Sequence, residues 1–282
     1  MLSLQKFVDA HAGVITANGI LRSVAYSPLQ EQLATELNVD VNDSNGLMAV
    51  DDKLSEAGAT IVQKYLSDVE LLATDQVIWG KLSNGFGYLN LRSMNFNGDS
   101  DINNLLAANE INDALSTRLT EVDHLVIDLR FNLGGNVPAA LKVANFIANQ
   151  SGHAFDISYK QADGLSIPSL IETTPMNIGF SGNVYILTSQ HTGSAAEAFI
   201  YAVKIGNQAH LIGENTRGIL AGPSPKTLAN GWVAMVPNRV ISSPSGEILE
   251  SIGFTPDTIL TAFTINDINQ KVDAVLEHVS TF

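Results

Sequence analysis

Residues 184–203 read Val-Tyr-Ile-Leu-Thr-Ser-Gln-His-Thr-Gly-Ser-Ala-Ala-Glu-Ala-Phe-Ile-Tyr-Ala-Val, an order that predicts a buried strand, a tight glycine turn and a helix. Ser194 falls at the N-terminus of that helix. Backbone N–H groups there lack intrahelical partners and can stabilise an oxyanion, and the hydroxyl is presented rather than buried. The stretch therefore offers Ser194 as a nucleophile. Because serine before a helix is most often a simple N-cap residue, other segments must decide between these roles.

The chain around this stretch alternates short β-rich runs with longer helical patterns. Before residue 80 it is mostly helical, with apolar residues at helical spacing over 28–37 and 54–66 and a loop at 42–46. After residue 80 the patterns predict strands at 86–91, 124–129, 184–187 and 209–212, helices at 105–119, 137–149 and 198–203, β structure over 232–241 and a final helix over 264–279. We therefore expect an α/β fold with a largely parallel sheet, divided into a mostly helical N-terminal region, 1–80, and a core, 81–282.

The composition is that of a globular protein with a sizeable core. Hydrophobic residues make up 45% of the 282 residues, and the net charge of −14 argues against nucleic acid and anionic membrane surfaces as partners. The chain has no cysteine, so it offers no disulfide and no thiol nucleophile. No apolar stretch reaches the ~18 residues of a membrane span. Residues 1–6 lack the apolar region of a signal peptide; a removed export signal would imply a bacterial periplasmic or extracytoplasmic location.

A second segment with chemical potential runs from Leu125 to Asn136. An apolar strand ends in charged residues and is followed by Gly134-Gly135, which opens a helix and lets backbone amides approach another group closely. Such a loop can supply oxyanion donors, although glycine also serves strand-to-helix turns for steric reasons alone. Asp128 and Arg130, at the end of this strand, are consistent with a structural ion pair that has no catalytic role. The segment matches no phosphate-binding motif, which argues against nucleotide binding.

Together these segments resemble the serine peptidase family that contains the C-terminal processing (tail-specific) proteases and the core of tricorn protease. The family's Asp-Leu-Arg-x-Asn-x-Gly-Gly pattern stands at 128–135, and its Ser-Ala-x-Glu turn stands at 194–197. Further matching blocks lie in the family's order at 213–218, 230–232 and 246–257. The resemblance covers residues 84–260 and implies a Clp protease/crotonase-like core. It also implies a peptide or protein substrate, with no metal or organic cofactor, and leaves open whether the chain forms a homo-oligomer.

One position departs from the C-terminal processing branch, in which a lysine acts as general base of a Ser-Lys dyad. Ile219 stands at that position and cannot accept a proton, and Lys226 falls outside the motif. The chain instead resembles the tricorn-like branch, whose catalytic residues form a Ser-His-Glu arrangement. In that branch the histidine comes from an early Asp-x-His segment and the glutamate from a late Gly-x-x-x-Glu block. Both occur here, as residues 9–11 and 246–250. Ala10 takes the place of a bridging serine, so the link from Glu250 to His11 would be direct or water-mediated.

The resemblance implies a role for each of these residues. His11 would take the Ser194 proton as general base, and Glu250 would orient its ring and stabilise the imidazolium form. The amide of Ala195, with Gly134 or Gly135, would face the tetrahedral oxyanion. His191 is the alternative base because it lies three residues before Ser194. Glu197 and the remaining histidines are expected to be structural.

Other classes of function stay open. The same fold occurs in noncatalytic binding modules with an apolar ligand cleft and in crotonase-like enzymes that act on acyl-CoA. The residue types alone indicate acyl transfer and would suit an esterase as well as a peptidase. The stretch between residues 9 and 85 carries no signature of the peptide-binding PDZ module found in many processing proteases.

Overall fold

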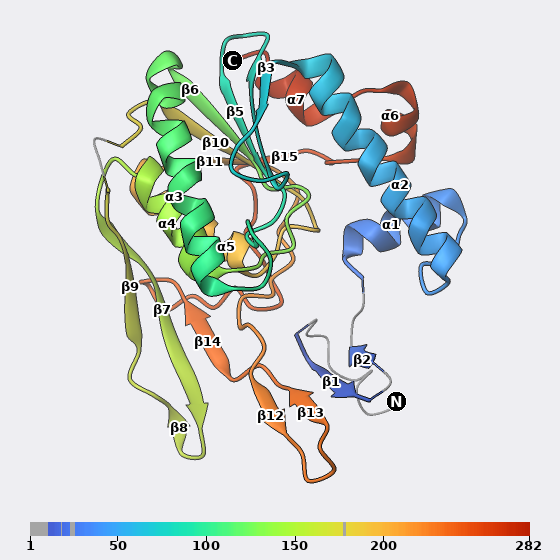
Figure 1. Cartoon of the computed structure of the whole chain (residues 1–282), viewed down its shortest axis with the longest axis vertical. Coiled ribbons are helices and arrows are strands. Elements are labelled where there is room, and N and C mark those ends of the chain that lie inside the picture. Colours follow the sequence, from blue (N-terminus) through green and yellow to red (C-terminus); the bar gives the residue numbers. More distant parts are fainter. Residues whose placement is uncertain (1–10, 18, 23–25, 177–178) are drawn as a thin grey trace.

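The computed structural model describes residues 11–17, 19–22, 26–176 and 179–282 (Figure 1). Its centre is a seven-stranded sheet in the order β15-β11-β10-β6-β5-β4-β3. The parallel strands are β5 (Gly87–Leu91), β6 (His124–Asp128), β10 (Asn183–Thr188), β11 (His210–Gly213) and β15 (Thr258–Ile259), and the antiparallel edge is formed by β3 (Leu66–Leu71) and β4 (Val77–Leu82). The α/β prediction with a largely parallel sheet is confirmed. The division at residue 80 stays a prediction, and β4 spans it.

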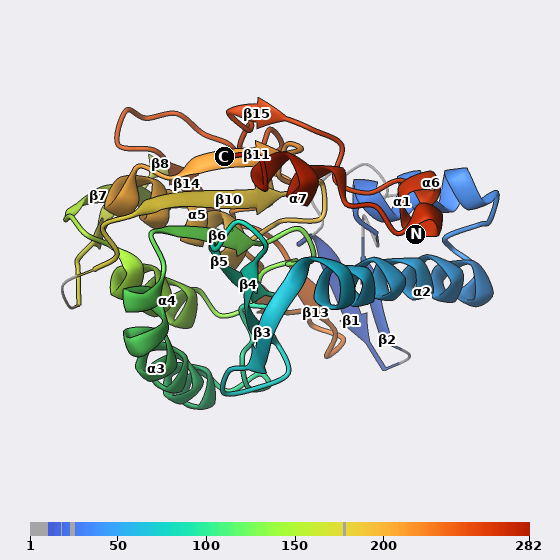
Figure 2. The same cartoon turned by 90° about the horizontal axis from the view of Figure 1, so that it is seen from above.

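Helices cover both faces of this sheet because side chains alternate along its strands. On one face, Leu125 and Ile127 of β6 pack with α3 (Asp101–Arg118), α4 (Val137–Ile147) and α5 (Ala195–Asn207). On the other, Val126 packs with α1 (Pro28–Leu37), α2 (Ser44–Thr60), α6 (Ile265–Gln270) and α7 (Ala274–Val279). Figures 1 and 2 show α3–α5 on one side of the sheet and α1, α2, α6 and α7 on the other. None of the described helices is long and apolar enough to cross a membrane.

A small antiparallel sheet joins the N-terminal strands to residues 225–235. It has the order β12-β13-β1-β2, formed by β1 (Gly13–Thr16), β2 (Gly19–Arg22), β12 (Pro225–Thr227) and β13 (Val233–Met235). Gly13 lies opposite Met235, and Met235 lies opposite Pro225. Residues more than 200 positions apart in the chain are therefore neighbours in this sheet.

A third sheet forms an arm that extends from the body in Figure 1. It consists of β7 (Gly152–Gln161), β8 (Gly164–Leu165), β9 (Ser169–Thr173) and β14 (Arg239–Ser242), with β14 and β9 both paired to β7. Strands β7, β8 and β9 are not among the strands predicted from the sequence.

Two predicted segments differ from the structure, and each difference has a local cause. The predicted C-terminal helix is broken into α6 and α7, since Lys271 adopts the left-handed conformation (φ 56°) and Asp273 caps a new helix. The predicted loop at 42–46 contains the start of α2, because the Asp43 side chain accepts hydrogen bonds from the amides of Asn45 and Gly46. A π-helical turn, Ile61–Tyr65, follows α2, and a 3-10 turn, Leu119–Glu121, follows α3.

Candidate active site

Two loops meet at the carboxyl ends of β6 and β10. These strands are neighbours with Leu187 opposite Asp128, so the segments 129–136 and 189–194 leave the sheet at the same edge. Gly193 N donates to Asn132 O over 3.0 Å and joins the two segments directly. In open α/β sheets, ligand sites form at this carboxyl edge. The Ser194 turn and the Gly134-Gly135 loop predicted from the sequence therefore lie side by side.

Ser194 has an unusual backbone conformation. It precedes α5 with φ 56° and ψ −121°, and its side chain is half-buried. A positive φ is uncommon for a residue other than glycine and costs about 1–3 kcal/mol, so the surrounding structure must hold it in place. Ser194 N donates to Glu197 Oε2 over 2.9 Å, which supplies one such restraint. Strain of this kind is a feature of sites where a side chain must be presented in a fixed direction.

The glycine loop contacts the Ser194 turn closely. A Cβ atom on Gly134 would lie 2.6 Å from Ser194 Cβ and 2.9 Å from Ala195 N. Only glycine fits there, and its φ of +109° also favours glycine. A Cβ atom on Gly135 would lie 2.4 Å from Asn95 N, so both glycines are required by close backbone contacts.

The amides of this loop differ in their availability. Gly134 N donates to Asn132 Oδ1 over 2.8 Å, and Asn132 is itself held by a 2.8 Å hydrogen bond from its Nδ2 to Leu91 O. Among the residues that the structure describes, the amides of Gly135 and Ala195 donate to no protein acceptor. The Gly134 amide is thus already committed, whereas the Gly135 and Ala195 amides are available to a ligand.

Glu197 holds the nucleophile turn to the segment that follows β11. The side chain is fully buried, and besides Ser194 N it accepts from Thr216 Oγ1 (2.6 Å), Gly218 N (2.8 Å) and Ile219 N (2.9 Å). Burial raises the pKa of this carboxyl, and the four hydrogen bonds oppose the shift. Glu197 is structural, as expected, but it acts through hydrogen bonds rather than through a salt bridge.

Ile219 occupies the position directly beside the nucleophile turn. Its Cγ1 and Cδ1 atoms lie 2.9 Å from where a Cβ on Gly193 would be, and its side chain is buried. The residue in the place of the expected lysine therefore packs against the backbone that precedes Ser194. Lys226 lies on β12 with an exposed side chain.

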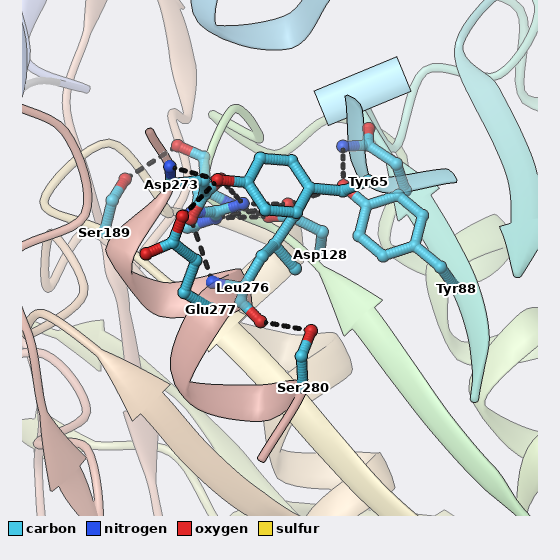
Figure 3. A network of polar contacts seen from close by, with 10 residues as sticks. Tyr65, Tyr88, Asp128, Ser189, Asp273, Leu276, Glu277 and Ser280 are labelled. Atoms are coloured by element: carbon cyan, nitrogen blue, oxygen red, sulfur yellow. Dashed lines mark hydrogen bonds and ion pairs between the residues drawn. The ribbon is translucent and has the colours of Figure 1, made fainter. Parts of the chain in front are cut away.

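Asp128 and Arg130 form the structural ion pair that the sequence suggested, together with a partner it did not reveal. Arg130 Nη2 lies 2.7 Å from Asp128 Oδ2 and 2.8 Å from Asp273 Oδ2, and Tyr88 Oη donates to Asp128 over 2.7 Å (Figure 3). Burial lowers the pKa of Arg130, but the Asp128 and Asp273 carboxylates outweigh it and raise that pKa overall. The cluster joins β5, β6 and the N-cap of α7.

Five of the six histidines have structural surroundings. His191 Nδ1 lies 2.7 Å from Ser27 Oγ; burial, aided by the Arg217 charge, lowers the pKa of His191 to about 4. The ring is thus neutral near pH 7 and is engaged with the N-cap of α1, which does not support it as the alternative base. The remaining four pack or bond elsewhere: His124 with Phe86, His153 with Asp156, His210 with Thr258 and His278 with Phe282.

His11 lies in a turn two residues before β1, and its side chain is half-buried. Gly13, Met235 and Pro225 are aligned across the sheet, so His11 and Ala12 lie at the end of the sheet where the chain enters β12. The segment that leads into β12 begins at Ile219, beside Gly193. Asp9 and Ala10, the other residues of the early motif, lie outside the described residues.

Glu250 contacts the same segment, 218–224. Its Oε2 accepts from Ala221 N over 2.8 Å, and the adjacent Ser251 N donates to Gly218 O over 2.7 Å. The side chain is half-buried. Residues 218–224 thus adjoin both Glu250 and the end of the β1 sheet, and through Ile219 they contact the turn before Ser194.

Ser27, Asn132 and Asp273 also support the site, a role that the sequence patterns do not predict. The spacing of Ser27 and Gln30 matches a capping box, which the structure contains, and so could have located the start of α1. Nothing in the sequence indicates that Ser27 would bind His191. In the described part of the chain, no group of three or more His, Asp or Glu side chains could hold a metal ion.

The chain is similar to known proteins in both sequence and structure. The profile of peptidase family S41 matches residues 85–260. Carboxyl-terminal-processing peptidase 2, chloroplastic, from Arabidopsis thaliana is 27% identical over 180 residues, which cover 63% of this chain and 32% of that protein. Tricorn protease from Thermoplasma volcanium is 29% identical over 157 residues, which cover 54% of this chain and 14% of that protein. The match therefore spans less than a third of either relative.

The fold has a counterpart over nearly the whole chain. The crystal structure of a candidate peptidase from Parabacteroides merdae superimposes with a TM-score of 0.68 at 19% identity. The superposition covers 96% of this chain and 76% of that one. At this identity the likeness concerns the fold alone, and it extends beyond the segment that the family profile matches.

Proposed function

Because this chain belongs to peptidase family S41, we propose that it is a serine hydrolase that cleaves peptide bonds through an acyl-enzyme on Ser194. The observation that carries the proposal is the contact between the Gly134 backbone, Ser194 Cβ and the Ala195 amide. It sets a strained serine beside backbone donors at the carboxyl edge of a parallel sheet. An N-cap serine with no other role needs neither the strain nor the neighbouring loop.

The oxyanion would be bound by the amides of Ala195 and Gly135. Both amides are available, and the loop that carries Gly135 contacts the Ser194 turn. Gly134 contributes differently: its amide goes to Asn132, and its missing side chain allows the approach. Preorganised donors at the site of developing charge are worth about 10²–10³-fold in rate for each donor.

His11 is the proposed general base, and Glu250 is proposed to orient it. The other five histidines are engaged elsewhere, and Ile219 cannot accept a proton. The pairing of β1 with β13 brings His11 and Ala12 to the end of the sheet that adjoins residues 218–224, where Glu250 also lies. This arrangement favours a base contributed from the far end of the sequence.

In the proposed reaction, His11 removes the Ser194 proton as Oγ forms a bond to the substrate carbonyl carbon. The oxyanion returns its electron pair, the C–N bond breaks, and the imidazolium of His11 gives its proton to the leaving amine. Water then attacks the acyl-enzyme, again giving its proton to His11, and Ser194 recovers a proton as the acid product departs. The Glu250 carboxylate stabilises each imidazolium form.

Labelling with a fluorophosphonate tests the proposal, because only an activated serine displaces fluoride from phosphorus. We expect one adduct at Ser194, located by mass spectrometry, and its loss in Ser194→Ala. His11→Ala should slow labelling by about 10²–10⁴-fold. His278→Ala, which removes a histidine that contacts Phe282, is the matched control and should label like the wild type.

Three other results would refute the proposal. A His11→Ala variant that labels at the wild-type rate would remove His11 as the base. Absence of labelling combined with tight binding of an apolar ligand would indicate a binding module, and full acyl-CoA turnover by Ser194→Ala would indicate a crotonase-like enzyme. Cleavage of a peptide library, read by mass spectrometry and compared with ester hydrolysis, distinguishes a peptidase from an esterase.

A further inference from the structure

A cavity of about 290 Å³ lies between α2, with its π-helical extension, and strands β4 and β5. Residues 88, 90 and 92 alternate along β5 and just beyond it, so their side chains share the face that lines the cavity. Residues 55–63 supply the opposite wall. The proposed reaction uses none of these residues, although Tyr88 also donates to Asp128 in the cluster described above.

The first polar group of this cavity is a cation without a partner. Arg92 is exposed at the rim, and its Nη2 lies 3.6 Å from where a Cβ on Gly58 would be. In the part of the chain that the structure describes, the Arg92 guanidinium makes no hydrogen bond or ion pair. The protein carries 29 acidic and 15 basic residues, so an arginine without a carboxylate partner is unexpected. Guanidinium groups bind carboxylates in a bidentate manner.

The second polar group is a buried acceptor without a donor. Asn90 is 5% exposed and lines the cavity. Tyr88 Oη donates its proton to Asp128, so it accepts from Asn90, which identifies the Asn90 atom at 3.1 Å as Nδ2. The other atom, Oδ1, has no hydrogen-bond partner among the described residues. A buried acceptor of this kind requires a donor, and the described residues supply none.

The rest of the lining is mostly apolar. Ile61, Val62, Ile78 and Phe131 contribute to the walls. The first two belong to the π-helical turn, a distortion that is frequent at functional sites. A volume of about 290 Å³ equals that of about ten liquid water molecules, which suits a ligand of about ten non-hydrogen atoms.

We propose that this cavity binds a small organic acid with a ring or short apolar body. Its carboxylate pairs with Arg92, its body lies between the π-helical turn and Ile78, and a hydroxyl group donates to Asn90 Oδ1. Phe131 belongs to both the cavity wall and the loop that ends in Gly134-Gly135, so the ligand contacts the segment that faces Ser194. This proposal is independent of the proposed hydrolase activity.

The test is titration of the full chain with 4-hydroxybenzoate, followed by isothermal calorimetry and by protein NMR. We expect saturable 1:1 binding with shifts in the amides of residues 58–63 and 88–92. Arg92→Gln should weaken binding by about tenfold, the value of one charge-assisted hydrogen bond. Ala59→Phe, which fills the cavity from an exposed position, should abolish binding. Lys160→Gln on β7, with an exposed side chain and the same change in charge, is the matched control.

Ligand analogues test each predicted contact separately. Benzoate lacks the hydroxyl and 4-hydroxybenzamide lacks the negative charge, so each should bind more weakly than 4-hydroxybenzoate. The proposal is overturned by absence of saturable binding, by equal affinity of the wild type and Arg92→Gln, or by NMR shifts confined to another surface. Because binding is read without turnover, these results do not depend on whether Ser194 is catalytic.

Discussion

Replacing Gly134 with alanine adds one methyl group where the glycine loop already touches the Ser194 turn. The new Cβ would lie 2.6 Å from Ser194 Cβ, 2.8 Å from Gly193 O and 2.9 Å from Ala195 N, and the last two are backbone atoms that cannot rotate away. Overpacking costs about 1–3 kcal/mol, and a φ of +109° adds about 1–3 kcal/mol of strain. The two costs together lower the free energy of unfolding by about 2–6 kcal/mol. A folded protein usually has a free energy of unfolding of about 5–15 kcal/mol, so most of that range exceeds the cost. We expect a folded protein in which the loop has moved away from Ser194.

The assay is the rate of fluorophosphonate labelling at Ser194, with folding checked by circular dichroism. Displacement of an oxyanion donor should slow labelling by about 10²–10³-fold. Gly164→Ala is the matched control, because Gly164 also has a positive φ (+135°) but has no heavy atom within 4 Å of the added Cβ. It should lose stability by strain alone and label within about twofold of the wild type. A folded Gly134→Ala variant that labels as fast as this control would refute the reasoning.

Four further substitutions probe the surroundings of Ser194. Glu197→Gln places an NH₂ group opposite N–H or O–H donors. Labelling should slow by about tenfold, and urea unfolding should show that the free energy of unfolding falls by about 1–3 kcal/mol. An unchanged labelling rate would contradict the role of Glu197 in holding the Ser194 turn. Arg130→Met leaves two buried carboxylates without a cation and should lower the unfolding free energy by about 3–5 kcal/mol; a loss below about 1 kcal/mol would argue against the cluster. Ile219→Val keeps an apolar contact with Gly193 and should label within about threefold of the wild type, whereas a larger loss would give Ile219 more than a packing role. The pKa of His191 is lowered to about 4 in the folded protein, so below about pH 6.5 the unfolded chain binds more protons than the folded chain does. About 3 kcal/mol of stability is therefore present above that pH and is lost as the pH falls toward 4. Urea titrations at about pH 7 and pH 4.5 should show that His191→Gln reduces this loss, and an equal loss in both proteins would contradict it.

The elements around the site were predictable because their signals are local. The strand before Ser194, the helix after it and the strand that ends at Asp128 each have an apolar pattern of the right length, and all three are present. Strands β7 to β9 were missed because they form an arm with mostly exposed or half-buried residues, whose pattern does not depend on a shared core. The predicted C-terminal helix is divided at Lys271 and Asp273, a break that the apolar spacing does not indicate. The Asp273 carboxylate that caps α7 also binds Arg130, a partner 143 positions away.

For the site, the sequence was sufficient to indicate a serine at a helix N-terminus, a glycine loop and an isoleucine where a lysine was expected. These are properties of short segments, and they follow from chain geometry and side-chain chemistry. Which groups are available to react depended on contacts between distant segments: Asn132 takes the Gly134 amide, Ser27 binds His191, and Ile219 packs against Gly193. Buried polar groups take whichever partners the packed fold brings within about 3 Å, and no local pattern specifies those partners.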